Sequence, residues 1–290
     1  MNQFRLHVNF QTNDVLLDAM DRLTQKTFDF SFKSWREKNY WNSTHIPYAF
    51  FDQSVCIAAV MVSIFDFTFQ QQEKRYIQLG TVMCDEAYRK QGLTRKLIEI
   101  ILAEWKTKCA GIFLYANDDV LNFYPRFGFI KEREYHQSCT IPTSQSLTKR
   151  LNVNRPDDGS CFKRIFSYGN PYTSIQLHNH KSIIMFHLLM YLHDHVYYLP
   201  AYDAIVIAVI HHDTMYCYDI YAKSSIDMKN LLSGVGDQPY SSVIFGFPVL
   251  DKFKFSSHQH NDADTNLFVY AKKENIFHDH TIMFPLICHT

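Results

Sequence analysis

The sequence has no excess of charge of either sign, because 29 Lys and Arg residues balance 29 Asp and Glu residues. Binding to nucleic acid or to an anionic membrane surface needs a basic excess, so we expect neither partner. No apolar run approaches the about 18 residues that a membrane span requires. The first residues also lack the basic flank and apolar core of a signal peptide, and we expect a cytoplasmic protein.

Metal-binding and disulfide patterns are missing as well. The seven cysteines are scattered and form no Cys-x-x-Cys pair, which favours free thiols in a reducing compartment. Alternate histidines such as His258-x-His260 could share an ion on a strand. However, the His-x-His pairs adjoin polar residues typical of loops, and no His-Glu-x-x-His motif occurs. We therefore expect no metal, and interpret the histidines as solvated loop residues with a few buried, hydrogen-bonded rings.

The most informative stretch runs from residue 76 to residue 129. Residues 76–83 are rich in β-branched and aromatic side chains, which predicts a strand. Apolar residues then recur from Leu93 to Trp105 on one helical face, which predicts an amphipathic helix of about four turns. Between them lies the segment 89–94, with the sequence Arg-Lys-Gln-Gly-Leu-Thr.

A strand, a glycine-containing turn and a helix start direct free backbone N–H groups at one point. Together with the helix dipole and the side chains of Arg89 and Lys90, these groups favour a bound phosphate or pyrophosphate. The alternative is that Gly92 only relieves crowding in a tight turn.

The next segment makes the pattern more specific. Residues 112–116 predict a short buried strand, and residues 118–127 predict a short helix that ends at Gly128. Arg89-x-x-Gly92-x-Thr94 resembles the acyl-CoA signature of the GNAT superfamily of N-acetyltransferases. Asn117 followed by Phe-Tyr-Pro-Arg-Phe-Gly-Phe at 123–129 resembles the next motif of that family. Thr94 departs from the pattern, which usually has Gly or Ala at that position.

The resemblance implies an α/β (α+β) fold with a mixed, mostly antiparallel sheet flanked by helices, and transfer of an acetyl or other short acyl group from acetyl-CoA to a primary amine. Acetyl-CoA is then a co-substrate and no metal is needed. The residues that the resemblance assigns to acetyl-CoA are Val82, Met83 and Cys84 on the strand, Arg89, Lys90, Gln91, Gly92, Leu93 and Thr94 in the turn, and Asn117 and Phe123 after it.

By its place in the motif, Tyr124 matches the usual general acid of the family. A phenol suits this role because it stays protonated at neutral pH and can donate to the departing thiolate. The alternative for Tyr124 is a half-buried aromatic residue on the helix. The general base stays open among a water chain, Asp66, Glu73 and the Thr290 carboxylate. A nucleophilic role for Cys84 is disfavoured, because direct transfer needs no thiol.

A polar segment with two prolines marks the expected domain boundary. We predict a GNAT acyl-CoA-binding catalytic domain over residues 1–140, a linker over 141–160 and a C-terminal α/β domain over 161–290. The last part predicts strands at 203–209, 214–222, 242–249, 267–271 and 281–286, with a helix at 226–232.

The order of strands and helices in the C-terminal part repeats that of the first part, so we predict a degenerate copy of related topology. It has no phosphate-turn motif before its helix, and we expect it to close the acceptor cleft without binding CoA. Two alternatives to an enzyme remain, a catalytically inactive CoA-binding regulator and a ligand- or peptide-binding module. The expected partner is a small-molecule or peptide amine, and the expected state is a monomer or a homodimer.

Overall fold

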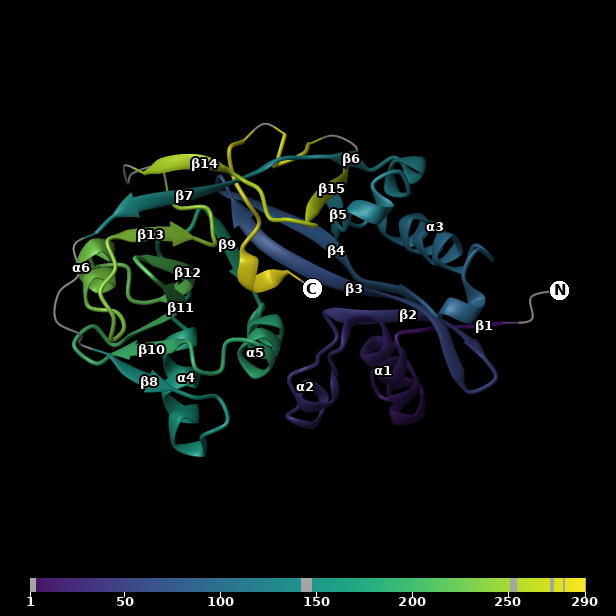
Figure 1. Cartoon of the computed structure of the whole chain (residues 1–290), viewed down its shortest axis with the longest axis horizontal. Coiled ribbons are helices and arrows are strands. Elements are labelled where there is room, and N and C mark those ends of the chain that lie inside the picture. The colour runs from purple at the N-terminus through teal and green to yellow at the C-terminus, as the bar shows by residue number, and fades with distance from the viewer. Residues whose placement is uncertain (1–3, 142–147, 251–254, 272–273, 279, 290) are drawn as a thin grey trace.

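Two β-sheets stand side by side in the computed structural model, each with helices packed against it (Figure 1). The structure describes residues 4–141, 148–250, 255–271, 274–278 and 280–289. Mixed α/β architecture with a second unit of related topology is thus confirmed.

The first sheet carries the motif-bearing segment. Its strand order is β1-β2-β3-β4-β5-β15-β6, and β9 also pairs with β3. Neighbouring strands are antiparallel except for β4 and β5, so the sheet is mostly antiparallel, as expected. The strands are β1 (Arg5–Val8), β2 (His45–Asp52), β3 (Val55–Phe69), β4 (Gln72–Cys84), β5 (Gly111–Ala116), β6 (Ile130–Lys131), β9 (Ile175–His178) and β15 (Asn266–Ala271).

Helices cover both faces of this sheet (Figure 1). On one face lie α1 (Asp14–Phe28), which begins where the Asn13 side chain accepts from the N–H of Leu16, and α2 (Lys33–Glu37). On the other face lies α3 (Leu93–Trp105), the amphipathic helix expected from the sequence. Its buried stripe ends at Trp105, whose indole N–H donates to the Tyr48 hydroxyl of β2 at 2.9 Å. This hydrogen bond and the buried stripe from Leu93 to Ile101 hold α3 against the sheet.

The second sheet has the order β14-β7-β13-β12-β11-β10-β8. In it, antiparallel β11 and β12 are followed by α6 and by β13, which is parallel to β12. This repeats the succession of β3, β4, α3 and β5 in the first sheet. The elements are β7 (Glu134–Thr140), β8 (Lys149–Leu151), β10 (Val196–Leu199), β11 (Ala204–His211), β12 (Thr214–Tyr221), β13 (Ser242–Phe245) and β14 (Ser256–His260), with α4 (Gly159–Phe166), α5 (Lys181–Met190) and α6 (Met228–Ser233).

The strands of each sheet do not all come from one of the predicted domains, 1–140 and 161–290. β7 falls within the expected first domain but pairs with β13 and β14 in the second sheet. Conversely, β15 from the expected C-terminal part pairs with β5 and β6 and fills the first sheet. The expected linker, 141–160, contains β8 and the start of α4, while its residues 142–147 lie outside the described part. An alternating pattern predicts a strand but not its partner, which explains these errors.

The strand expected at residues 281–286 is also wrong. This segment has no strand pairing in the structure, and it leads into a short 3₁₀ turn at Leu286–Cys288. Its apolar side chains fill the core between the sheets, where Phe284 packs against Phe65 with ring centroids 5.2 Å apart. The main-chain N–H of Phe284 donates to the buried Glu134 carboxylate at 2.8 Å. A side-chain acceptor therefore takes the place that a strand partner was expected to fill.

Helices α2 and α5, from the two parts of the chain, contact each other in the main core. The Trp35 indole of α2 donates to the carbonyl of Ser182 in α5 at 2.8 Å, and the Ser182 hydroxyl donates to the carbonyl of Tyr40 at 2.6 Å. Helix α5 lies between the sheets, close to α2 in Figure 1. The C-terminal part thus contributes directly to the surroundings of α1 and α2.

Among the helices of the described residues, none has the length and the apolar character of a membrane span.

Candidate functional site

The site begins where β4 and β5 part. They are paired only from Tyr76 opposite Gly111 to Gln78 opposite Phe113, whereas β4 continues to Cys84 and β5 to Ala116. An irregularity in the pairing of β3 with β4 accompanies this separation, and Thr81 there has a φ of +43°. A bulge of this kind turns the strand away from its neighbour. The ends of β4 and β5 consequently leave main-chain groups free to meet a ligand.

The turn before α3 adjoins this opening. Lys90 and Gly92 both have left-handed conformations, with φ of +64° and +75°. Gly92 is the N-cap of α3 and supplies no capping side chain, so the N–H groups of the first turn keep their hydrogen-bonding capacity. A Cβ at Gly92 would meet no atom within 4 Å, because the turn is open on that side. The helix dipole and the basic side chains of Arg89 and Lys90 make this turn suitable for phosphate groups.

A cleft of about 1010 Å³ runs from the turn to the opening between the strands. Of the residues that the sequence assigned to acetyl-CoA and catalysis, all except Gln91 line it. The structure therefore brings together two segments about 30 residues apart in sequence, at Val82–Thr94 and at Asn117–Tyr124. The predicted residues lining the cleft are Val82, Met83, Cys84, Arg89, Lys90, Gly92, Leu93, Thr94, Asn117, Phe123 and Tyr124.

Tyr124 occupies the first position of a short 3₁₀ turn, Tyr124–Phe127. The expected single helix over 118–127 is instead two such turns, and Gly128 ends the second with a φ of +89°. The Tyr124 ring packs against Phe129 and Phe268, with centroids 6.1 and 5.9 Å away. Burial raises the pKa of Tyr124 to about 12, so the phenol keeps its proton throughout the physiological range. Within the described residues, its hydroxyl has no hydrogen-bond partner.

Cys84 lines the cleft, but its thiol is not activated. Burial raises the pKa of Cys84, and this outweighs the lowering by Arg89 and by a hydrogen bond from Thr94. A raised pKa reduces the thiolate fraction, which disfavours a nucleophilic role.

The candidates for a general base lie elsewhere. Asp66 forms an ion pair with Arg75 at 2.6 Å on the exposed part of the β3–β4 hairpin. Glu73 on the same hairpin accepts from Thr68 and lies 3.2 Å from a nitrogen of His178. Neither carboxylate is among the residues lining the cleft. Thr290 falls outside the described residues.

Several cleft residues escaped the sequence analysis. Tyr88 and Arg95 flank the turn, and Arg95 follows Thr94 directly in the first turn of α3. The helix register could have identified Arg95, because it lies in the first turn of α3, next to the 89–94 segment.

Asp264 and Thr265 also line the cleft. They precede β15 and reach the cleft only because β15 pairs with β5. No signal within the chain segment itself indicates that placement.

A second hollow of about 320 Å³ adjoins the cleft and shares Phe28, Thr81, Tyr115 and Thr265 with it. We call it the aromatic cavity. It lies between β3, the α1–α2 segment and α5, so both parts of the chain form its wall. Its remaining lining residues are Phe30, Phe32, Trp35, His45, Met61, Ser63, Ile183, Phe186, His187, Tyr191 and His289.

Burial keeps the histidines of the aromatic cavity neutral. It lowers the pKa of His45 and of His289 to about 3, and that of His187 to about 4. A nitrogen of His45 lies 2.9 Å from the Ser63 hydroxyl, and a nitrogen of His187 lies 2.8 Å from the carbonyl oxygen of His289. The expectation of a few buried, hydrogen-bonded histidines therefore holds for His45 and His187. Over all the described ranges, the cavity included, His, Cys, Asp and Glu side chains form no group of three that could hold a metal ion.

These histidines should make the folded state acid-sensitive. With His180, whose pKa burial lowers to about 4, four histidines are neutral when folded but bind protons below about pH 6.5 when unfolded. Their stabilisation is present above that pH and is lost as the pH falls. Glu134 and Asp219, with pKa values raised by burial to about 7 and about 6, oppose this trend.

We expect a net loss of roughly 3 kcal/mol per pH unit between pH 6 and pH 5, from about two more protons bound by the unfolded chain. Urea unfolding at the two pH values measures the change. His45→Gln should reduce the slope, whereas the same substitution at the exposed His278 should not. Equal unfolding free energies at both pH values would contradict the expectation.

Residues 17–129 match the model of the acetyltransferase (GNAT) family. A solved structure from Enterococcus faecalis V583, a conserved protein of unknown function and probable N-acyltransferase, is 14% identical over 92% of this chain and 72% of its own, with a TM-score of 0.56. A GCN5-related N-acetyltransferase from Kribbella flavida gives the same four values. Eis1 from Mycobacterium abscessus is 11% identical over 91% of this chain and 72% of its own, with a TM-score of 0.53. The similarity establishes a shared fold over both sheets. No curated protein matches the sequence.

Proposed function

We propose that the chain transfers an acetyl group from acetyl-CoA to a primary amine by direct attack, and the match of residues 17–129 to the acetyltransferase (GNAT) family model supports this. The observation that carries the proposal is the cleft in which the opening between β4 and β5 meets the N-terminus of α3. It combines free main-chain groups, an anion-binding turn and a protonated phenol. These are the groups that a thioester, a pyrophosphate and a departing thiolate require.

The two ends of the cleft suit the two ends of acetyl-CoA. At the turn, main-chain N–H groups from Gly92 to Thr94 bind the pyrophosphate, and Arg89, Lys90 and Arg95 add positive charge. Along β4, main-chain groups of Val82, Met83 and Cys84 bind the pantetheine arm, and a donor there polarises the thioester carbonyl. Asn117 and Phe123 complete the arm's binding site from the opposite side.

In the reaction, the uncharged amine attacks the thioester carbonyl carbon, an N–C bond forms and the C–S bond breaks. Tyr124 donates its proton to the leaving thiolate, and the proton lost by the amine nitrogen restores the phenol through solvent or a base. The products are an amide and free CoA. The raised pKa of Tyr124 suits this role, because the group must hold its proton until the thiolate forms.

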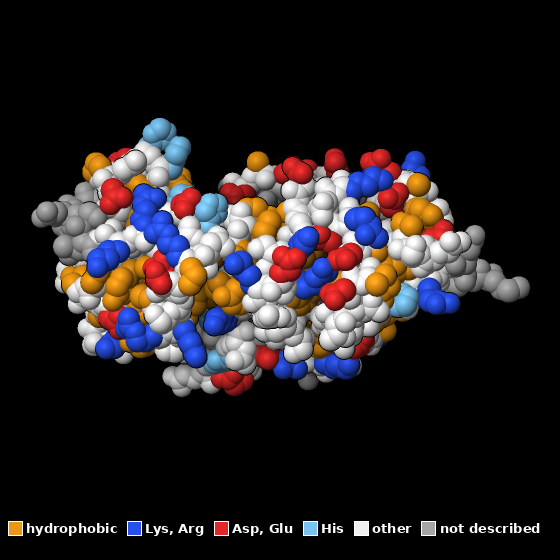
Figure 2. All heavy atoms as spheres, turned by 90° about the horizontal axis from the view of Figure 1, so that it is seen from below, with side chains coloured by type: hydrophobic (Ala, Val, Ile, Leu, Met, Phe, Trp, Pro, Cys, Tyr) orange, Lys and Arg blue, Asp and Glu red, His pale blue; other side chains and the backbone are white. Residues whose placement is uncertain are grey.

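Charge distribution is compatible with a small-molecule or peptide amine in the cytoplasm. On the face seen from below Figure 1, Figure 2 shows Lys, Arg, Asp and Glu side chains intermingled, without a field of one sign. Such a surface gives little long-range attraction for a polyanion or a polycation. Acceptor selection then depends on the cleft and its neighbouring cavity.

Titration of the full chain with acetyl-CoA in a calorimeter tests the donor site. We expect micromolar binding, followed by release of free CoA when an amine acceptor is added. Absence of heat on titration, with the chain folded, overturns the proposal.

A further inference from the structure

The aromatic cavity is positioned to present a second substrate to the donor cleft. Phe28, Thr81, Tyr115 and Thr265 line both hollows. Thr81 is the left-handed residue beside which β4 turns away from β5. A molecule in the aromatic cavity therefore lies next to the strand segment that would hold the thioester.

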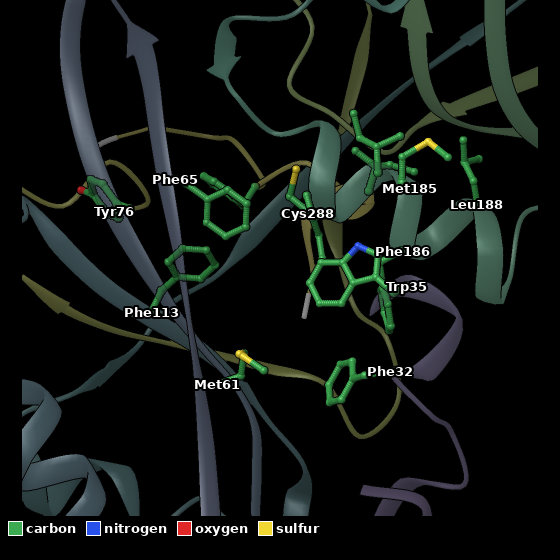
Figure 3. Packing of buried hydrophobic residues seen from close by; sticks show 14 of the residues in the cluster. Phe32, Trp35, Met61, Phe65, Tyr76, Phe113, Met185, Phe186, Leu188 and Cys288 are labelled. Atoms are coloured by element: carbon green, nitrogen blue, oxygen red, sulfur yellow. The ribbon is translucent and has the colours of Figure 1, made fainter. Parts of the chain in front are cut away.

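The wall of the cavity is suited to an aromatic ring. Figure 3 shows Phe32, Trp35, Met61 and Phe186 pointing towards one another from the α2 region, β3 and α5. Phe186 lies edge-on to Trp35 at 5.3 Å and near Phe32 at 5.8 Å between centroids. Rings in these orientations offer both edges and faces, which favours aromatic over aliphatic ligands of equal size.

Its electrostatics disfavour a charged amine. Among the described residues that line the cavity there is no Asp, Glu, Lys or Arg, and the three histidines are neutral. An ammonium group would lose its hydration without gaining a counter-charge. Attraction to the aromatic faces only partly offsets that loss. Attack on the thioester also requires the uncharged amine, a form in which roughly one in 10³ molecules of a lysine-like amine exist at pH 7.

One polar atom in the wall lacks a partner. Nε2 of His289 is buried and has no hydrogen-bond partner within the described part of the chain. The ring stacks on Tyr115, with centroids 3.9 Å apart and planes at 28°. A hydrogen bond to the backbone of Phe284 raises the pKa of His289, although burial lowers it more. In the tautomer that carries its proton on Nδ1, Nε2 is an acceptor, and a ligand N–H that donates to Nε2 would favour this tautomer.

We propose that the aromatic cavity is the acceptor site and takes an arylamine, a primary amine attached directly to an aromatic ring and uncharged at neutral pH. Its ring packs against the wall formed by Phe32, Trp35 and Phe186, and its amino group donates a hydrogen bond to Nε2 of His289. The inference rests on the acetyl transfer proposed above and specifies its substrate class. It makes α5 and the segment around His289 part of the acceptor site.

Three amines with six-membered rings separate the effect of aromaticity from the effect of charge. Aniline is aromatic and uncharged, benzylamine is aromatic and charged, and cyclohexylamine is aliphatic and charged at pH 7.5. CoA release by the full chain at saturating acetyl-CoA gives kcat/KM for each. We expect aniline to exceed cyclohexylamine by at least tenfold, with benzylamine between them. Equal values, or a preference for cyclohexylamine, overturn the arylamine assignment.

Variants locate the site. Phe186→Leu should raise KM for aniline about fivefold or more, while the Kd of acetyl-CoA stays unchanged. Phe245→Leu is the matched control, because Phe245 is also a buried phenylalanine but packs in the separate core of the second sheet. His289→Phe should lower kcat/KM for aniline about tenfold, with partial recovery in His289→Gln. Equal KM values in the Phe186 and Phe245 variants overturn the placement.

Calorimetry on the same samples separates the two proposals. Acetyl-CoA binding without a preference for aniline rejects the acceptor class and leaves the donor function standing. No acetyl-CoA binding by the folded wild type rejects both.

Discussion

Gly92→Glu should weaken acetyl-CoA binding by at least about 100-fold. The new side chain would enter the open side of the turn, where a Cβ meets no atom within 4 Å, and would place a carboxylate beside the phosphates. Each pair of like charges at about 4 Å costs roughly 1 kcal/mol in water and roughly 4 kcal/mol near a protein surface. A total near 3 kcal/mol corresponds to about 100-fold in Kd. Calorimetric titration with acetyl-CoA measures the loss.

Two controls separate this effect from backbone strain. Gly92 has a φ of +75°, so any side chain there costs about 1 to 2 kcal/mol of conformational energy. Gly92→Gln carries the same strain and bulk without the charge, and should bind more tightly than Gly92→Glu. Gly169 also has a positive φ, of +67°, and open space around its Cα, but lies outside the cleft. Unchanged binding by Gly92→Glu, or equal losses in Gly169→Glu, would exclude the phosphate turn.

Tyr124→Phe should lower kcat by about 10²- to 10⁴-fold, the usual contribution of a general acid. The Kd of acetyl-CoA should change little, because the ring and its packing against Phe129 and Phe268 are retained. Loss of the hydroxyl should also cost little stability, since it has no hydrogen-bond partner among the described residues. Steady-state CoA release and urea unfolding measure the two quantities.

Tyr88→Phe is the matched control within the same cleft. Its hydroxyl donates to the Asp52 carboxylate at 2.9 Å, so we place it outside the chemical step. We expect kcat within about threefold of the wild type, because the Tyr88 hydroxyl proton is already donated to Asp52 and is not free for a thiolate. If Tyr124→Phe turns over as fast as Tyr88→Phe, Tyr124 is a packing residue. If both bind acetyl-CoA and the wild type also lacks turnover, the inactive CoA-binding regulator becomes the better description.

Local patterns determined the cleft at the start of α3. The apolar stripe of α3, the open turn at Gly92 and the short segment around Tyr124 were all predictable, because each depends on residues close together in the sequence. The resemblance of two motifs to the GNAT patterns then named the residues of one cleft. All of them but Gln91 line it.

Only the tertiary structure decided the aromatic cavity and the division into sheets. β7 and β15 carry ordinary strand patterns, yet each completes the sheet opposite to the one expected, because hydrogen-bonding edges are filled by whichever strand the fold brings near. The aromatic cavity joins Trp35, Phe186 and His289, which are far apart in sequence. Helical aromatic residues look the same whether they fill a core or line a cavity. The difference is whether another element fills the space beside them, and a sequence does not encode that locally.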